Sequence, residues 1–404
     1  MKKILFAAFA ASLVAAGCQK TEVYQPANSG EKMTFSTEMK KITKAEGDGT
    51  TTSKNEGTQS LEKQGFNLWA YAAYSTENIT NVADNRIYDG MEAMALSYSS
   101  AGSWGPVGDK AYYWPGQGKD LRFFAVSSNN IIMKGEDKQV EITPGIAEDK
   151  TSSPHIITLS VPTMSIKDYT VASTGDKIAE DDLMVADFLD QNQSENERTV
   201  ALNFHHALSK VEFLFKATIP TGSPDNLKVY VQKLSVLDLC DKGTLSVTTT
   251  GFPTENKTYQ APVTLSWGST QTGKASFTKK SGDEFTGSVE LIKEGETQIF
   301  AENLATEIDP TTTAAKPLTF AKWLMLPQSI TGKLVEIIYI IGDRQFKAVF
   351  PLDKSTSGEA SLSEWETNKY IKYTVNLSPN MISFDAKVEE DWQPEGGNNI
   401  DHIN

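Results

Sequence analysis

Apolar and polar residues alternate with a period of two along much of this chain, which is the pattern of half-buried β-strands. The segments 369–377 and 381–392 show it most clearly, and 201–217 and 227–239 repeat it. Amphipathic helical patterns of useful length are scarce. The pattern therefore predicts an all-β protein.

Other segments are strand-like without strict alternation. The segment 66–74 is aromatic, and 121–127 is an apolar run with a single charge. The segment 333–352 predicts a hairpin that turns near Gly342 and Asp343. Strands separated by turn signals predict β-sandwiches, and this number of strands predicts two of them.

The loop 218–226 is the best candidate for a domain boundary, because it holds two prolines and a glycine between two strong strands. We therefore expect an N-terminal sandwich over 33–217 and a C-terminal sandwich over 218–404. The first domain would begin with a short strand at 33–37. A loop rich in Gly, Ser, Thr and Lys follows at 38–60 and is expected to be exposed.

Residues 1–17 have the features of a secretory signal peptide: two lysines, then an apolar stretch too short to span a bilayer, which needs about 20 residues. Cys18 follows small residues directly, and this resembles the lipobox of bacterial lipoprotein signals. We expect Cys18 to carry lipid and the polar segment 18–32 to act as a tether. An ordinary signal peptide followed by a chance cysteine is the alternative.

Composition narrows the functional classes. The 404-residue chain has a net charge of −14, which argues against a nucleic-acid partner because phosphate binding needs a basic face. Two cysteines and four histidines are too few for a zinc framework or a disulfide scaffold. With Cys18 assigned to lipid, Cys240 is left as a lone thiol, better interpreted as a small buried hydrophobe than as a nucleophile.

Catalytic chemistry finds no support in the motifs. The chain lacks the sequence signatures of nucleophile elbows, zinc proteases, phosphate loops and dinucleotide sites. His205 and His206 are adjacent, so on a strand their rings would point to opposite faces and would not bind one metal. Asp181 and Asp182 are better explained as a turn before a strand than as an acid–base pair, and 190–196 lacks the glycine and twelfth-position acid of a calcium loop. We predict that the protein is not an enzyme.

Four aromatic residues raise the question of sugar binding, since their rings could stack on a glycan. They are Trp69, Trp104, Tyr113 and Trp114. Residues of this kind more often fill a sandwich core. We therefore expect no metal and no cofactor, apart from the covalent lipid on Cys18.

An ordered set of segments resembles the fimbrillin-like lipoproteins of the Bacteroidetes, which are subunits of type V pili, and the set covers nearly the whole chain after the signal. The segments are the lipobox at Cys18, MTFST (33–37), FNLWAYA (66–72), AYYWP (111–115), LRFFAVS (121–127), DDLMVA (181–186), FHHALSKVEF (204–213), WLMLPQ (323–328), and YIKYTVNL with ISFDAKVEEDW near the end.

This resemblance implies two tandem transthyretin-like β-sandwiches in a lipoprotein of the outer membrane that is exposed at the cell surface, in the fimbrium. It also implies assembly by donor-strand exchange. A surface protease cuts the loop after the first strand, that strand leaves, and an extended segment of another fimbrial subunit fills the groove. Such a contact does not close on itself, so it builds a filament.

Mapped onto this sequence, the displaced strand is 33–37. Its inward-facing residues would be Met33, Phe35 and Thr37.

The cut would fall at Lys40, Lys41 or Lys44. The first arginine of the chain is Arg86, beyond this loop, so a lysine-specific or trypsin-like protease is expected rather than an arginine-specific one.

The tail 393–404 is polar and rich in Gly and Asn, with Ile400 and Ile403 as its only aliphatic residues. A tail of this kind has little to place in an apolar groove, which favours a tip or accessory subunit involved in adhesion over a main stalk subunit. The alternative function is a lipid-anchored adhesin or glycan-binding lipoprotein, with a host or bacterial surface ligand, that never polymerises.

Overall fold

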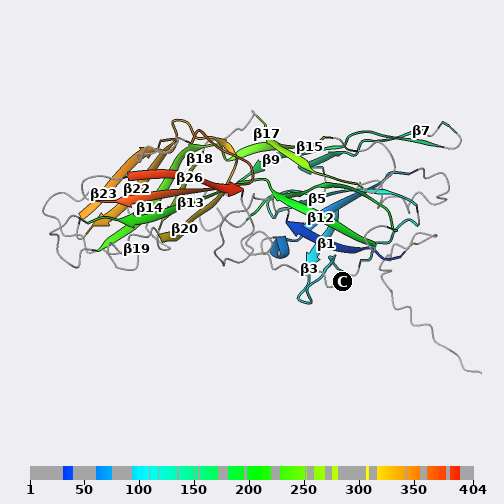
Figure 1. The fold of residues 1–404 in the computed structure, drawn as a ribbon, viewed down its shortest axis with the longest axis horizontal. Coiled ribbons are helices and arrows are strands. Elements are labelled where there is room, and N and C mark those ends of the chain that lie inside the picture. The colour runs from blue at the N-terminus through cyan, green and yellow to red at the C-terminus, as the bar shows by residue number, and fades with distance from the viewer. Residues whose placement is uncertain are drawn as a thin grey trace, which may run out of the picture.

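The molecule is elongated and has two β-rich halves along its long axis, with β5, β12 and β1 in one half and β14, β22 and β23 in the other (Figure 1). The computed structural model describes residues 31–39, 61–74, 93–108, 110–116, 118–133, 136–149, 151–152, 155–171, 181–194, 198–219, 228–250, 252, 259–268, 275–280, 306–308, 316–341, 344–354, 362–378 and 383–391.

A nine-stranded sheet dominates the first half, with the order β1-β12-β10-β5-β2-β3-β4; β11 pairs with β5 and with β16. Its strands are β1 (Thr34–Met39), β2 (Phe66–Ala72), β3 (Met94–Tyr98), β4 (Trp104–Pro106), β5 (Leu121–Ser127), β10 (Met184–Ala186), β11 (Phe188–Gln191), β12 (Thr199–His206) and β16 (Tyr259–Ala261).

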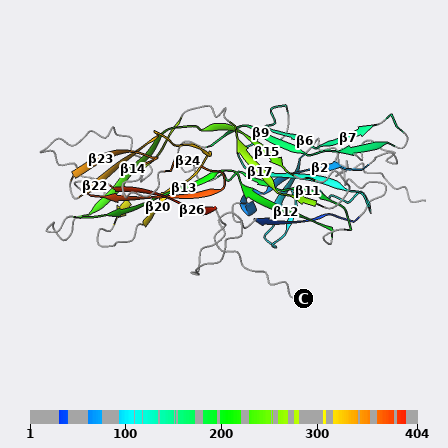
Figure 2. The same cartoon turned by 45° about the horizontal axis from the view of Figure 1, so that its top comes forward.

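A four-stranded sheet, in the order β17-β15-β9-β6, packs on one face of the nine-stranded sheet. A separate ribbon of β7 and β8 lies beyond it, at the end of the long axis (Figure 2). The strands are β6 (Val140–Thr143), β7 (Ile146–Asp149), β8 (Ile156–Leu159), β9 (Thr163–Thr170), β15 (Lys242–Thr249) and β17 (Val263–Trp267).

The second half is a sandwich of two sheets, β20-β13-β25-β26 and β18-β14-β22-β23, with β19 paired to β14 and a short β21–β24 pair. Its strands are β13 (Ser209–Ala217), β14 (Val229–Leu239), β18 (Ala275–Lys280), β19 (Thr306–Ile308), β20 (Lys316–Met325), β21 (Gln328–Ser329), β22 (Leu334–Ile341), β23 (Arg344–Pro351), β24 (Glu364–Trp365), β25 (Lys369–Leu377) and β26 (Ser383–Asp391).

The nine-stranded sheet is buried on both faces at its centre. Every residue of β5 is buried, because its side chains alternate between two separate cores. Phe124 and Val126 face the four-stranded sheet, whereas Leu121 and Phe123 face a second core on the opposite side. A strand buried on both faces loses the polar alternation, which explains the continuous apolar run in the sequence.

The second core exists because the sheet curls until its two ends, β1 and β4, approach each other. The Trp104 indole N–H on β4 donates a hydrogen bond to Thr37 Oγ1 on β1 at 2.9 Å. Between them, Phe66 packs against both Trp104 and Phe204, with ring centroids 4.9 and 5.3 Å apart. The nine-stranded sheet thus encloses a core of its own.

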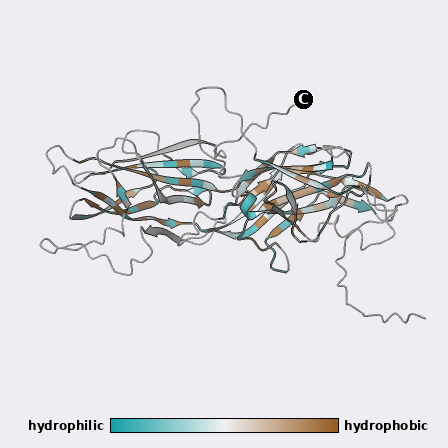
Figure 3. Ribbon diagram, turned by 90° about the horizontal axis from the view of Figure 1, so that it is seen from below, coloured by the Kyte–Doolittle hydropathy of each residue, from teal (hydrophilic) through white to brown (hydrophobic). Residues whose placement is uncertain are grey.

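The C-terminal sandwich confirms the predicted alternation. Ile371, Tyr373, Val375 and Leu377 of β25 are all buried. The predicted hairpin is also present, because β22 and β23 pair Ile341 with Arg344. Brown and teal alternate along many of the strands in Figure 3, as expected for sheets with one face on a core.

The predicted boundary at 218–226 is wrong, because this loop does not separate the sheets of the two halves. The strand β13, before it, belongs to the C-terminal sandwich, whereas β15 and β17, after it, pair in the sheet of β9 and β6. The chain therefore passes between the halves three times: from β12 to β13, from β14 to β15, and from β17 to β18. Alternation specifies that a segment is a strand but not which sheet it joins, so sequence pattern placed the boundary wrongly.

Helix is limited in the described residues, where a single helical turn covers 61–64. Within these ranges, no helix combines the length and apolar character needed to cross a membrane.

The glycine between this helical turn and β2 supports a first prediction. Gly65 has φ +70°, and a Cβ placed there would lie 2.4 Å from the carbonyl oxygen of Leu96. Gly108 has a similar φ of +78°, with no atom within 4 Å of a Cβ. Gly108→Ala should lower the free energy of unfolding by about 1 kcal/mol through backbone strain alone. Gly65→Ala should lower it by at least about 2 kcal/mol more, because the backbone at Leu96 must also move. Urea unfolding of both variants measures this difference. Equal losses of unfolding free energy would contradict a steric conflict between a Cβ at position 65 and the carbonyl oxygen of Leu96.

Candidate functional site

The first strand is the candidate site, and its partners come from distant parts of the chain. The strand β1 pairs in parallel with β12 at the edge of the nine-stranded sheet, from Thr34 opposite Thr199 to Met39 opposite Phe204. Just upstream, the Met33 N–H donates to Tyr112 O at 2.8 Å. Because β1 and β12 are parallel and far apart in sequence, no tight turn ties them together.

Two side chains anchor this segment in the second core. Met33 is 2% exposed and Phe35 is 7% exposed, so both are buried beneath the sheet edge. Thr37 follows on the same side and accepts the Trp104 hydrogen bond. Thr34 faces outward, where its hydroxyl lies 2.8 Å from the Thr199 hydroxyl. The edge strand therefore presents an inward series of two large apolar side chains and one hydroxyl.

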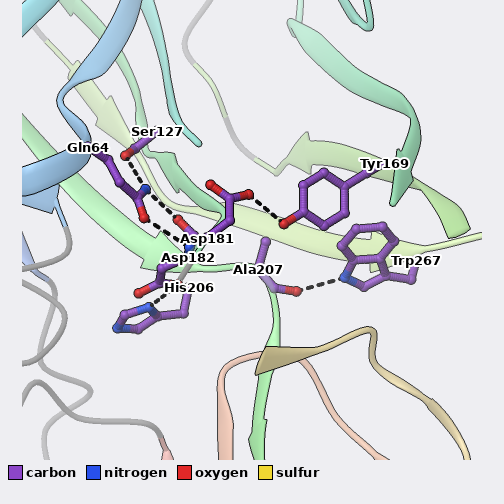
Figure 4. Close-up of polar contacts among 8 residues, drawn as sticks. All are labelled: Gln64, Ser127, Tyr169, Asp181, Asp182, His206, Ala207 and Trp267. Carbon is purple, nitrogen blue, oxygen red and sulfur yellow. Dashed lines mark hydrogen bonds and ion pairs between the residues drawn. The ribbon is translucent and has the colours of Figure 1, made fainter. Parts of the chain in front are cut away.

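The chain beyond the loop is held in part by hydrogen bonds that do not involve β1. Leu61 is 1% exposed and belongs to the second core, as Met33 and Phe35 do. The Gln64 amide donates to Ser127 Oγ and to Asp182 O, both at 3.0 Å, and its oxygen accepts the Asp182 N–H at 2.9 Å (Figure 4). Gln64 thus fixes the end of this helical turn to the body independently of the first strand.

The adjacent histidines bind two different carboxylates, as their placement on a strand predicts. His205 Nε2 lies 2.7 Å from Asp187 Oδ1, and His206 Nδ1 lies 3.0 Å from Asp182 Oδ1. The two aspartates flank β10, so β12 is held to its neighbour by a polar contact on each face. In the ranges that the structure describes, no group of three or more His, Cys, Asp or Glu side chains is arranged to hold a metal ion.

The adjacent carboxylates of Asp181 and Asp182 contact different partners. The Asp181 carboxylate accepts hydrogen bonds from the Tyr169 hydroxyl at 2.8 Å and the Ser128 hydroxyl at 2.6 Å, whereas Asp182 contacts His206 (Figure 4). Burial, followed by the charge of Asp181, raises the pKa of the Tyr169 phenol well above its usual value. This arrangement fixes the segment that leads into β10, so the two carboxylates have structural partners, although residues 181–183 do not form the predicted turn.

The aromatic residues considered for sugar stacking divide into two groups. Trp69 and Trp114 are buried in the cores. Trp104 and Tyr113 are half-buried, and Trp104 packs against Tyr98 at 5.1 Å as well as against Phe66. The rings therefore serve mainly as packing, and Trp104 in addition faces the first strand.

The segment 190–196 does not assemble a calcium loop from its described residues. Asp190 is occupied by a buried bidentate contact with Arg122, with both N–O distances 2.8 Å. Asn192 accepts hydrogen bonds from the Ser194 N–H and hydroxyl, which makes a local turn.

Sequence reasoning did not identify Arg122 as a structural residue. Its third nitrogen donates to the carbonyls of Pro144, Gly145 and Ser160 at 2.7 to 3.2 Å, where the β7–β8 ribbon joins the body. The signal that could have found it is the single charge inside the apolar run 121–127, since a buried charge requires a partner.

Several predicted site residues lie outside the described residues. They are Cys18, Lys40, Lys41, Lys44 and the tail 393–404. The lone thiol Cys240 is half-buried rather than fully buried. Its backbone N–H and carbonyl both bond the Gln328 side chain, at 2.7 and 3.0 Å, where the chain passes from β14 to β15.

Comparison with known proteins identifies the class of this β protein. The sequence profile of the fimbrillin-like family matches residues 43–392. The chain belongs to the fimbrillin-like family. No curated protein matches the sequence.

Solved structures of similar fold include a fimbrial protein from Bacteroides vulgatus, with 15% identity and a TM-score of 0.50 over 90% of this chain and 100% of that one. A putative cell adhesion protein from Bacteroides uniformis has 16% identity and a TM-score of 0.41 over 83% and 95% of the two chains. A fimbrilin from Porphyromonas gingivalis has 10% identity and a TM-score of 0.35 over 89% and 96%.

The buried phenol of Tyr169 leads to a prediction for alkaline pH. An unfolded tyrosine ionises near pH 10, whereas the folded pKa is higher, so its contribution to stability is complete below about pH 10 and is lost as pH rises toward the folded pKa. Above pH 10, Tyr169→Phe should make the fall in unfolding free energy shallower by about 1.4 kcal/mol per pH unit.

The measurement is urea unfolding at several pH values from 8 to about 11.5. Tyr259→Phe removes an exposed phenol and serves as the matched control, with the slope of wild type. Equal slopes for the Tyr169→Phe variant and wild type would contradict the prediction.

Proposed function

We propose that the protein is the precursor of a fimbrial subunit in which β1 is a removable strand. A protease would cut the loop 38–60, β1 would leave, and an extended segment of another subunit would replace it beside β12. The observation that carries the proposal is that β1 is an edge strand whose inward side chains complete an enclosed core. Membership of the fimbrillin-like family and the fold of a fimbrial protein support this class of function.

The anchoring of the two sides of the loop supports removal of β1 without loss of the body. The downstream side is fixed by the three hydrogen bonds of Gln64, none of which involves β1. The strand upstream depends on pairing with β12, on the contacts around Tyr112, and on burial of its own side chains. After a cut, non-covalent contacts alone would retain β1.

The energetics favour refilling of the groove. Burial of Met33 and Phe35 contributes about 1.5–3 kcal/mol each. Departure of β1 would also leave the backbone groups along one edge of β12 unpaired, which is an aggregation hazard. An extended segment from another subunit would restore both contributions, because its main chain would pair with β12 and its alternate side chains would fill the core.

If Cys18 carries lipid, a single cut in the loop would both open the groove and release the subunit from its membrane anchor. The tether 18–32 lies upstream of β1, and the candidate cut sites Lys40, Lys41 and Lys44 lie downstream of it. A single cleavage by a lysine-specific or trypsin-like protease would open the groove. It would also separate the subunit from an anchor in the outer membrane.

Cleavage is tested with a variant that carries Lys→Gln at 40, 41, 44 and 54, the four lysines of the loop, expressed on cells with an epitope tag. Wild type treated with trypsin should lose its N-terminal segment and enter ladders that resist mild SDS, whereas the variant should remain a monomer. Lys54→Gln, in the same loop, is the matched control and should behave as wild type. Cleaved wild type that stays monomeric would instead support the unpolymerised adhesin or glycan-binding lipoprotein.

The tail provides a separate test of position in the fimbrium. Its aliphatic residues Ile400 and Ile403 are three apart, a spacing that puts them on opposite faces of a strand. As a tip or accessory subunit, the protein would accept a strand without donating one. Deletion of 393–404 should therefore leave incorporation into ladders unchanged; complete loss of incorporation would contradict the tip position while leaving cleavage and strand acceptance intact.

A further inference from the structure

The end of the groove beneath Thr37 differs chemically from the end beneath Met33 and Phe35. At the first end, Trp104 Nε1 donates to the Thr37 hydroxyl at 2.9 Å. At the other end, the two inward side chains of the segment are apolar and buried. The groove, meaning the site that residues 33–37 occupy, thus offers a hydrogen-bond donor at one end and an apolar core at the other.

The Trp104 indole is held by residues that do not belong to β1. Its ring packs against Phe66 of β2 at 4.9 Å and against Tyr98 of β3 at 5.1 Å, and β3 pairs with β4. Phe66 in turn packs against Phe204 of β12 at 5.3 Å. None of the rings in this aromatic row belongs to β1, so these contacts with the indole do not depend on β1.

We propose that Trp104 is a specificity-determining residue of the groove and selects a strand with a hydroxyl at the position of Thr37. The proposal rests on the strand replacement proposed above and names the partner's chemistry. The fitting segment is extended, runs parallel to β12, and carries large apolar residues at positions i and i+2 and Ser or Thr at i+4. A β-branched apolar residue of the same shape would leave the half-buried indole N–H without its acceptor.

The chain's own tail does not match this pattern. Within 393–404, the aliphatic residues are three apart, and no two apolar residues are separated by a single position. A strand donated from this tail would therefore not satisfy Trp104, which agrees with a subunit that accepts a strand without donating its tail.

The test uses trypsin-cleaved protein that retains its N-terminal fragment and measures exchange of that fragment for labelled peptides of residues 31–39. The unaltered peptide should exchange in. A Thr37→Val peptide should bind about tenfold more weakly, the equivalent of one lost hydrogen bond. A Thr34→Val peptide, altered on the outward face, should remain within about twofold of the unaltered one.

A Trp104→Phe protein completes the double-mutant cycle. There, the unaltered and Thr37→Val peptides should bind equally, because the donor is absent. The peptide comparison on unaltered protein decides the question even if this variant does not fold.

The outcomes separate the two proposals. Equal binding of the unaltered and Thr37→Val peptides to unaltered protein would overturn the role of Trp104 while strand replacement stands. A tenfold loss that persists in a folded Trp104→Phe protein would also overturn it. Failure of every peptide to exchange, or undiminished binding of a Phe35→Asp peptide, would overturn strand replacement itself and the Trp104 proposal with it.

Discussion

Burial of the centre of the nine-stranded sheet on both faces is the constraint on which the first half of the molecule depends. The strand β5 has no solvent face, so every side chain on it must satisfy one of two cores. Its one charge, on Arg122, is tolerated because Asp190 and three carbonyls surround it. The second core is closed because the sheet curls and β1 meets β4. The edge strand β1 therefore completes this core.

The strands and loop end next to β1 are held by polar contacts that do not involve β1. The histidine contacts with Asp182 and Asp187 fix β12 on both faces, and Gln64 fixes the chain where the loop ends. Three passages of the chain between the halves give the sandwiches a common framework rather than a single hinge. A strand could then be exchanged at the edge while the sheet that receives it keeps its register.

The sequence predicted what depends on period and composition, and missed what depends on long-range contacts. Alternation identified β25, and the turn signal near Gly342 and Asp343 identified the β22–β23 hairpin. The short segment predicted at 33–37 is β1 at Thr34–Met39. The domain boundary was wrong because strand pattern carries no information about sheet membership. The pairing of Arg122 with Asp190, and of Trp104 with Thr37, joins residues 68 and 67 positions apart, which no local pattern encodes.

The order of pairing also defines a route along which an assembled subunit would carry tension. The edge that β1 occupies belongs to β12, and only Ala207 and Leu208 separate β12 from β13. The strand β13 pairs in parallel with β25 over eight residue pairs, and β25 pairs with β26, the last described strand. A pull applied to β12 at one end and to β26 at the other would act lengthwise on these strands, so that many ladder hydrogen bonds would resist it together. The passages from β14 to β15 and from β17 to β18 join the same two halves, so three segments of the chain, rather than one, resist separation of the halves.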